Sequence, residues 1–140
     1  MYLLDTNVIG EIARNPQCDT AARVAALSPE EFGINPIVAC EIEYGLTKRG
    51  SFKLRRQIET ILEAIPVLEF PTDVAAHYGR IRVDLEKRGT PIGPNDLLIA
   101  AHGLSSDLTV ITGNEKEFRR VAGLKVENWL LKGAKTLSGP

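Results

Sequence analysis

Short apolar stretches alternate along the chain with longer segments in which apolar residues recur at helical spacing. The short stretches cover residues 2–4, 31–35, 67–70 and 108–112 and the surroundings of Val126, and they predict strands. The longer segments predict helices over residues 8–14, 19–27, 37–48, 52–64, 72–88, 95–105 and 115–120. Because parallel strands need helical crossovers, this order favours an α/β fold: a three-layer sandwich with a central, mostly parallel sheet and helices on both faces.

The length of 140 residues predicts one compact domain, which we place at residues 1–131. Residues 132–140 are polar and are expected to form a mobile tail. The formal net charge of −1 gives no overall positive field, so any contact with nucleic acid must depend on local basic patches.

The distribution of apolar residues argues against secretion and membrane insertion. Asp5 interrupts the first apolar stretch too early for a secretory signal, and no apolar run approaches the length of a membrane span. We therefore expect a cytoplasmic protein with no membrane partner. Cys18 and Cys40 form no CxxC pair, so neither a disulfide nor a zinc site is expected.

Three carboxylates stand beside apolar residues, where a lone charge is costly. Asp5 ends the first predicted strand, Glu41 follows the apolar run 37–40, and Asp96 precedes the apolar run 97–101. A buried ionised carboxylate needs hydrogen bonds, a cation or a proton. If several of them converge, a divalent cation relieves their mutual repulsion.

The available ligands favour magnesium over zinc. Carboxylate oxygens suit the octahedral coordination of Mg²⁺, whereas His77 and His102 fit no metal-binding spacing. The chemistry that such a site supports is hydrolysis of a phosphodiester.

Each acid also has a simpler structural interpretation. Asp5 is a suitable N-cap for the helix that follows it, and Asp96 is a first-turn acid favoured by the helix dipole. The helix pattern alone does not distinguish Glu41 from Glu43 as the residue that faces the interior.

Four motifs, taken in order, resemble the PIN-domain family, and more closely the VapC-type ribonuclease toxins of bacterial toxin-antitoxin pairs. They are LLDTNVI at 3–9, CEIEYG at 40–45, GPNDLLIAAHG at 93–103 and VITGNEKEF at 110–118. The ending at 123–129 is similar as well. The resemblance implies a PIN-like fold and a divalent-metal-dependent endoribonuclease, the toxin of a type II pair, that uses Mg²⁺, with Mn²⁺ as a substitute. It also implies an RNA substrate, a cognate VapB-type antitoxin, a homodimer and a toxin-antitoxin hetero-oligomer.

The resemblance assigns roles to individual residues. It implies that Asp5, Glu41 and Asp96 bind the metal, since Gly45 follows Glu41 at the distance of the family's E-x-x-x-G pattern and leaves Glu43 outside the site. It places Thr112 as the residue that supports a metal ligand or a water.

The fourth motif departs from the fullest form of the family pattern. Asn114 stands where many PIN domains have aspartate, and Glu117 is the next acid. We favour Asn114, as the nearer residue, to complete the catalytic set of Asp5, Glu41, Asp96 and Thr112. The alternative is a non-catalytic RNA-binding or regulatory PIN-like protein, which predicts RNA binding without magnesium and no cleavage.

Basic residues cluster around the turn at 48–56, along 80–88 and after the fourth motif. They are candidates to bind phosphates that flank a cut site. Lys116, Arg119 and Arg120 are the best placed, because they follow the predicted active-site loop.

Overall fold

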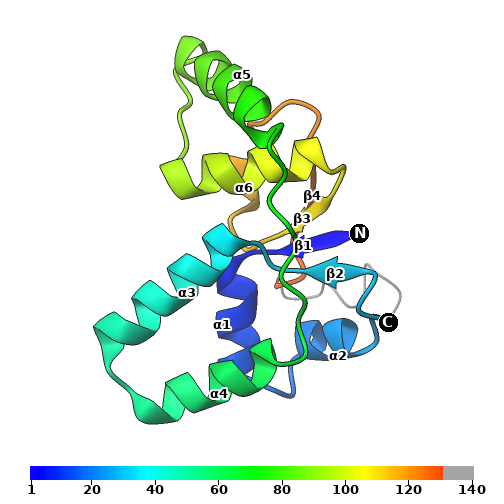
Figure 1. The fold of residues 1–140 in the computed structure, drawn as a ribbon, viewed down its shortest axis with the longest axis vertical. Helices are drawn as coiled ribbons and strands as arrows, with labels where there is room; N and C mark the ends of the chain where they lie inside the picture. Colours follow the sequence, from blue (N-terminus) through cyan, green and yellow to red (C-terminus); the bar gives the residue numbers. More distant parts are fainter. Residues whose placement is uncertain (131–140) are drawn as a thin grey trace.

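The computed structural model describes residues 1–130, so the predicted tail at 132–140 and the last residue of the predicted domain lie outside the described residues. Its four strands form one sheet in the order β2-β1-β3-β4, and every neighbouring pair is parallel (Figure 1). The strands are β1 (Tyr2–Leu4), β2 (Phe32–Gly33), β3 (Thr109–Ile111) and β4 (Lys125–Glu127). The parallel sheet confirms the predicted fold class.

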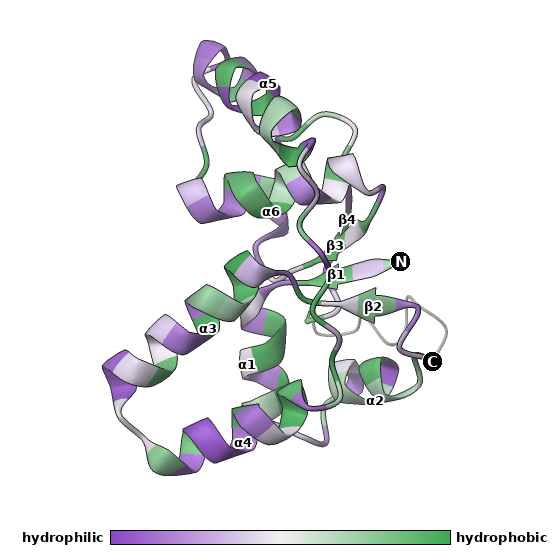
Figure 2. Cartoon of the chain, viewed as in Figure 1, coloured by the Kyte–Doolittle hydropathy of each residue, from purple (hydrophilic) through white to green (hydrophobic). Residues whose placement is uncertain are grey.

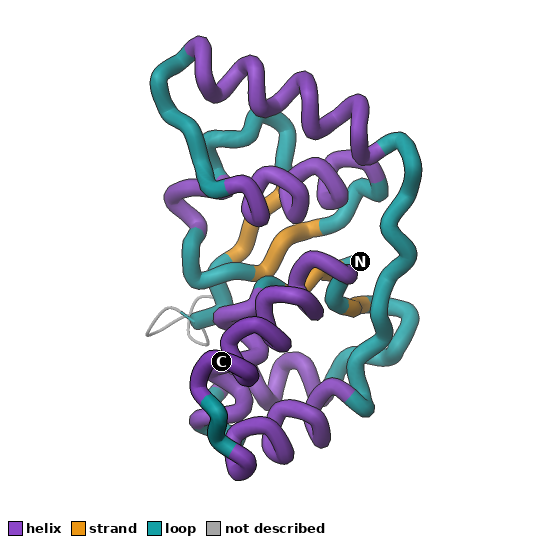
Figure 3. The backbone as a smooth tube through the Cα atoms, turned by 60° about the vertical axis from the view of Figure 1, so that its left-hand side comes forward, coloured by secondary structure: helices purple, strands orange, loops and turns teal. Residues whose placement is uncertain are grey.

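Seven helices connect and cover these strands within the described residues. They are α1 (Thr6–Arg14), α2 (Asp19–Ala25), α3 (Pro36–Arg49), α4 (Phe52–Leu62), α5 (Val74–Lys87), α6 (Pro94–Ser105) and α7 (Glu115–Phe118). Helices α5 and α6 lie on one side of the sheet, and α1, α2 and α4 lie on the other (Figures 1 and 3). No helix among the described residues is both long and apolar enough to cross a membrane.

The helices differ in how much of their surface they bury. Helix α4 carries both hydrophilic and hydrophobic stretches (Figure 2); Ile58 is its buried residue, and Leu54, Ile61 and Leu62 pack partly buried against the core. Helix α6 buries six residues, from Leu97 to Gly103, as its nearly continuous apolar sequence predicts. A Cβ on Gly103 would lie 2.8 Å from Leu124 Cδ1 and 3.2 Å from Val110 Cγ2, so glycine lets α6 approach β3 closely.

A buried histidine fixes α3 relative to α6. His102 is 1% exposed, and its Nδ1 lies 3.1 Å from Nδ2 of Asn35, the N-cap residue of α3. Burial lowers the pKa of His102, so the neutral ring accepts this hydrogen bond. Phe70 packs edge-on against the ring at 5.1 Å between centroids. His102 therefore has a structural role that holds two helices in register.

The strand predicted at 67–70 is wrong. The structure has only an isolated parallel bridge between Ile34 and Val67, although Leu68 N also donates to Ile34 O at 2.7 Å. Pro66 and Pro71 bracket the segment and have no N–H to extend the pairing, and the neighbouring β2 is itself only two residues long. The helix predicted at 72–88 is shorter and begins at Val74.

Strands β1 and β3 lie side by side at the centre of the sheet. After β1 the chain continues to β2 at one edge of the sheet, and after β3 it continues to β4 at the other edge. Parallel sheets of this kind have a crevice at the carboxyl ends of two such strands. Asp5 follows β1 and Thr112 follows β3, and Asp5 N donates to Ile111 O at 2.9 Å. The sheet thus brings two predicted site residues to one point from 107 positions apart.

Candidate active site

Asp5 is the most buried acid of the crevice, with 4% of its surface exposed. Its Oδ1 accepts a hydrogen bond from Thr6 N at 2.8 Å, and its Oδ2 accepts one from Thr112 Oγ1 at 2.7 Å. Burial raises the pKa of Asp5, and these two hydrogen bonds oppose the rise. Asp5 therefore caps α1 and also presents a carboxylate to the crevice.

Glu41, on α3, joins the cluster through the residue next to Asp5. Thr6 Oγ1 donates to Glu41 Oε1 at 2.7 Å, and Asn95 Nδ2 donates to Oε2 at 3.2 Å. Glu43 instead accepts bonds of 2.7 and 3.1 Å from Arg55 on the surface, which lower the pKa of Glu43 to about 2. The choice between these two acids, which the helix pattern leaves open, falls on Glu41.

Asp96 lies in the first turn of α6 and faces the other acids. Burial is the largest cause of its altered pKa, and the negative charges of Asp5, Glu41 and Glu117 add to it. Together they raise the pKa of Asp96 to about 7. Such mutual repulsion shows that the acids converge on a common region, where a cation would favour their ionised forms.

Asn114 and Glu117 both reach this region. Asn114 Nδ2 donates to Asp96 Oδ2 at 3.3 Å and to Glu117 Oε2 at 3.0 Å. The backbone N–H of Asn114 donates to Thr112 Oγ1 at 2.9 Å. Thr112 thereby connects the loop after β3 to Asp5, and Glu117 adds a fourth acid beside Asn114.

Three polar residues that sequence reasoning did not single out support the acids. Thr6 and Asn95 bind Glu41, and Asn7 Oδ1 accepts a bond from Gly113 N at 2.9 Å. Thr6 and Asn95 stand directly beside an acid of the first or third motif, and Asn7 stands two positions after Asp5. Their position within the motifs was the available signal, but their partners come from other segments of the chain.

The donor set fits a hard divalent cation. Asp5, Glu41, Asp96 and Glu117 offer only carboxylate oxygens, the ligands that Mg²⁺ prefers. Within residues 1–130, no three acidic, histidine or cysteine side chains converge tightly enough to hold an ion as they stand. Glu41 and Asp96 instead accept hydrogen bonds from the side-chain amides of asparagine residues.

Two of the basic residues predicted to bind phosphate already have partners. Arg119 pairs with Glu115 at 3.2 Å, and Arg120 Nη1 donates to Pro91 O at 2.9 Å. Lys116 is exposed. The guanidinium of Arg120 thus holds the loop that leads to α6 rather than facing the crevice.

Comparison with known proteins identifies the family of this chain. The family model described as "PIN domain" matches residues 2–124. Ribonuclease VapC1 of Haemophilus influenzae (strain R2866) is 36% identical over 135 residues, which cover 92% of this chain and 98% of the relative. The tRNA(fMet)-specific endonuclease VapC of Salmonella typhimurium is 34% identical over 131 residues, 91% of this chain and 97% of the relative.

The structure of VapBC2 from Rickettsia felis bound to a DNA fragment from their promoter contains a similar chain. That chain has a TM-score of 0.83 and 31% identity, and the match covers 91% of this chain and 98% of the other. The chain therefore belongs to the PIN-domain family.

Proposed function

We propose that this protein is the toxin of a type II toxin-antitoxin pair and acts as a divalent-metal-dependent endoribonuclease. The observation that carries the proposal is the convergence of Asp5, Glu41 and Asp96 at the carboxyl ends of β1 and β3. The ribonuclease names of its VapC relatives support the choice of RNA as the substrate. We place the protein in the cytoplasm, where its substrate would be.

Asp5, Glu41 and Asp96 would hold the metal, with Asn114 and Glu117 beside Asp96. We propose Mg²⁺ as the ion and Mn²⁺ as a substitute. When bound, the ion supplies Lewis acidity that orients the scissile phosphate and lowers the pKa of an attacking water.

The chain's own groups prepare this site by fixing its carboxylates. The Thr112 hydroxyl orients Asp5, while Thr6 and Asn95 orient the two oxygens of Glu41. Asn114 ties Asp96 to the loop after β3. Positioning of this kind reduces the reorganisation that metal and substrate binding would otherwise need.

A groove beside the acids is the proposed contact for a VapB-type antitoxin. It lies between α1, α3 and α4, has a volume of about 180 Å³ and is lined at one end by Thr6 and Glu41. Ile42, Leu54 and Ile58 supply apolar surface along the groove. A segment of the antitoxin lying there would bring a basic side chain to the acids, which are a favourable partner for it. The VapBC2 complex from Rickettsia felis is a precedent for pairing with an antitoxin.

We also propose that the chain forms a homodimer, and a hetero-oligomer with its antitoxin. Light scattering coupled to size exclusion tests both states: the isolated chain should elute with twice its monomer mass of 15.3 kDa. A monomer at micromolar concentration would contradict the dimer.

Cleavage of total RNA by the purified chain, freed of antitoxin, tests the enzyme. We expect discrete fragments with Mg²⁺ or Mn²⁺, none with EDTA, and none from Asp5→Asn or Asp96→Asn. Glu43→Gln is the matched control, because Glu43 is an exposed acid of the same helix as Glu41 that pairs with Arg55 outside the site. It should cleave like the parent protein.

The second candidate function is a non-catalytic RNA-binding or regulatory protein. One observation favours it: Asn114 has an amide where the family pattern has an acid. Glu117 counts against it, because its carboxylate lies 3.0 Å from that amide and supplies a negative charge there. RNA that stays intact with every metal, together with RNA binding that persists in EDTA, would favour this function over the nuclease.

A further inference from the structure

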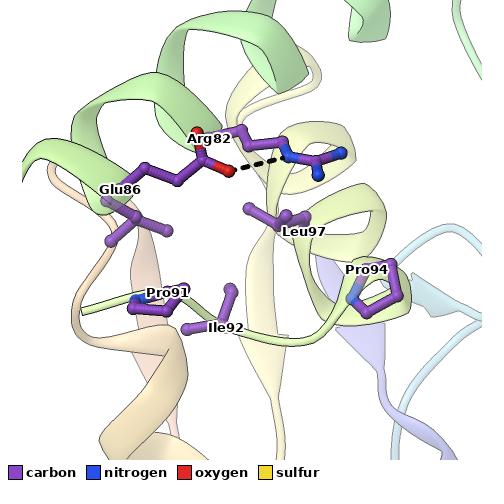
Figure 4. Close-up of a pocket in the computed structure, with 7 residues that line it drawn as sticks. Arg82, Glu86, Pro91, Ile92, Pro94 and Leu97 are labelled. Atoms are coloured by element: carbon purple, nitrogen blue, oxygen red, sulfur yellow. Dashed lines mark hydrogen bonds and ion pairs between the residues drawn. The ribbon is translucent and has the colours of Figure 1, made fainter. Parts of the chain in front are cut away.

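A second hollow lies between the second half of α5 and the start of α6, on another side of α6 from the acidic cluster. It has a volume of about 190 Å³. Leu85, Ile92 and Leu97 form its floor, and all three are at most 9% exposed. Arg82 and Glu86 stand on α5 opposite the loop that carries Pro91 and Ile92 (Figure 4). The hollow therefore combines an apolar interior with a charged mouth.

The first turn of α6 connects this hollow to the proposed catalytic site. Pro94 and Leu97 line the hollow, while Asp96, between them in sequence, faces the other acids. Residues three apart lie on one side of a helix, so Pro94 and Leu97 share a side that Asp96 does not. The hollow and the acids therefore lie on different sides of the first turn of α6, and a helix with its side chains is about 10–12 Å across. RNA that crosses this turn would place a scissile phosphate at the acids and a neighbouring base at the hollow.

The mouth of the hollow presents a donor and an acceptor side by side. Arg82 Nε donates to Glu86 Oε2 at 3.3 Å, and Arg82 Nη1 donates to Tyr78 Oη at 2.8 Å. Among the described residues, Arg82 Nη2 and Glu86 Oε1 have no further hydrogen-bond partner. A guanine base offers the matching groups on one edge: the O6 acceptor next to the N1–H and N2–H donors. Arginine commonly reads guanine through its acceptors, and unpaired bases in RNA are recognised along these edges.

The loop at the rim of the hollow is held in place from the far side. Arg120 Nη1 donates to Pro91 O at 2.9 Å, and Arg88 Nη2 donates to Arg120 O. Since Arg120 follows α7, these bonds join the rim to the segment that carries Glu117. The hollow is thus formed before a ligand arrives, which reduces the entropic cost of binding.

We propose that this hollow is a subsite for an unpaired guanine adjacent to the cut site of the RNA substrate. The base enters between the prolines of the loop and Leu97, with its polar edge on Arg82 and Glu86. The inference rests on the proposed function for the identity of the substrate, and it adds a specificity determinant outside the metal centre.

Binding of two labelled pentanucleotides, UUGUU and UUAUU, tests the subsite by fluorescence anisotropy. The measurements use the Asp5→Asn chain with Mg²⁺, so that hydrolysis does not interfere. We expect the dissociation constant of UUGUU to be at least about fivefold lower than that of UUAUU. This ratio is the lower end of the discrimination that a good base contact provides. Arg82→Ala and Glu86→Gln should each bring the ratio close to one. Their ion pair is exposed, so both variants should fold normally.

Arg80→Ala is the matched control, because Arg80 is an exposed arginine of the same helix that binds His77 rather than lining the hollow. It should keep the preference for guanine. Equal affinity of the parent chain for the two RNAs would overturn the proposal, as would a preference unchanged in both Arg82→Ala and Glu86→Gln. If Arg82→Ala and Glu86→Gln change only the mass of the homodimer or the affinity for the antitoxin, the hollow is a protein contact, and this outcome would also overturn the proposal.

Cleavage by the chain without the Asp5→Asn change separates this proposal from the proposed function. Guanine preference without cleavage leaves the subsite standing and rejects the nuclease. Metal-dependent cleavage without base preference leaves the nuclease standing and rejects the subsite.

Discussion

Burial of Asp96 and repulsion from the neighbouring acids raise its pKa to about 7, compared with 3.8 for an ordinary aspartate. Between these values the folded chain binds a proton that the unfolded chain has released. The ionised form therefore destabilises the metal-free fold fully above pH 7, and the penalty fades as the pH falls toward 4. At the scale of this residue, the charge that suits metal binding opposes folding.

Replacing Asp96 with asparagine should raise the unfolding midpoint of the metal-free protein at pH 8 by a few degrees, since about 1 kcal/mol corresponds to roughly 2–4 °C in a chain near this size. Thermal unfolding followed by circular dichroism in EDTA measures this difference, which should be smaller at pH 5. Glu43→Gln is the control and should not raise the midpoint, because Glu43 is stabilised as a charged group by Arg55. A lower midpoint for Asp96→Asn at pH 8 would contradict the origin of the shift.

Thr112 performs two tasks with one hydroxyl. It donates to Asp5 Oδ2 and accepts from Asn114 N, and the side chain is 0% exposed. Thr112→Val keeps the shape but leaves both groups without that partner, at a cost of about 1–3 kcal/mol for a buried polar group. We expect a lower urea midpoint and, since Asp5 loses a bond that favours its ionised form, weaker metal binding at pH 7.

Thr112→Ser is the matched variant, because it keeps the hydroxyl and removes only a methyl group. Urea unfolding and Mn²⁺ titration of both variants distinguish the loss of the hydrogen bonds from a change in packing. If Ser and Val destabilise the protein equally, the hydroxyl has no special role.

At the scale of the elements, α6 positions Asp96 through its close approach to the sheet. Gly103→Ala places a methyl group 2.8 Å from Leu124 Cδ1 and 3.2 Å from the fully buried Val110, so the helix or its neighbours must shift. Overpacking of a filled core costs typically about 1–3 kcal/mol. Denaturant unfolding should show a loss of that order, and RNA cleavage should fall with it.

Gly79→Ala is the same substitution in α5, where an added Cβ meets nothing within 4 Å. It should stabilise the protein by about 0.5–1 kcal/mol, because alanine favours a helix over glycine. If the free energy of unfolding falls in Gly103→Ala and rises in Gly79→Ala, the loss in Gly103→Ala comes from packing against the neighbours of α6. A loss of stability in both would refute the close approach as its cause.

Local periodicity explains why most elements were predictable and one was not. Helix α3 was predicted at 37–48 and spans Pro36–Arg49, because its capping asparagine, N-terminal proline and C-terminal glycine lie in its own sequence. The segment at 67–70 has the apolar composition of a strand. It pairs through only a few atoms because its neighbour is short and its flanks are prolines. Strand formation depends on partners that composition does not encode.

The candidate site divides in the same way. The three acids were predictable because each adjoins an apolar run and matches a motif. The choice of Glu41 over Glu43 was not accessible from the helix pattern, since it depends on Thr6 from α1 on one side and Arg55 from α4 on the other. The position of Glu117 also depends on the placement of α7 beside β4 and on its hydrogen bond with Asn114.

At the scale of the whole molecule, the acids come from the end of the first strand, the third helix and the sixth helix, so the site exists only when the sheet and these helices have assembled. A ligand that binds this arrangement and not the unfolded chain stabilises the entire fold. Protons compete with a metal for Asp96, whose pKa lies close to neutrality. Metal binding and global stability should therefore be coupled through pH.

We predict that Mg²⁺ raises the unfolding midpoint more at pH 8 than at pH 5.5, where Asp96 is largely protonated in the folded state. An ion at about one hundred times its dissociation constant contributes about 2.7 kcal/mol. Differential scanning fluorimetry over a series of Mg²⁺ concentrations measures the shift at each pH. Asp96→Asn should lose most of the Mg²⁺ response at pH 8, because the ion no longer relieves repulsion at that position. A response equal at both pH values and retained in Asp96→Asn would place the ion elsewhere on the molecule.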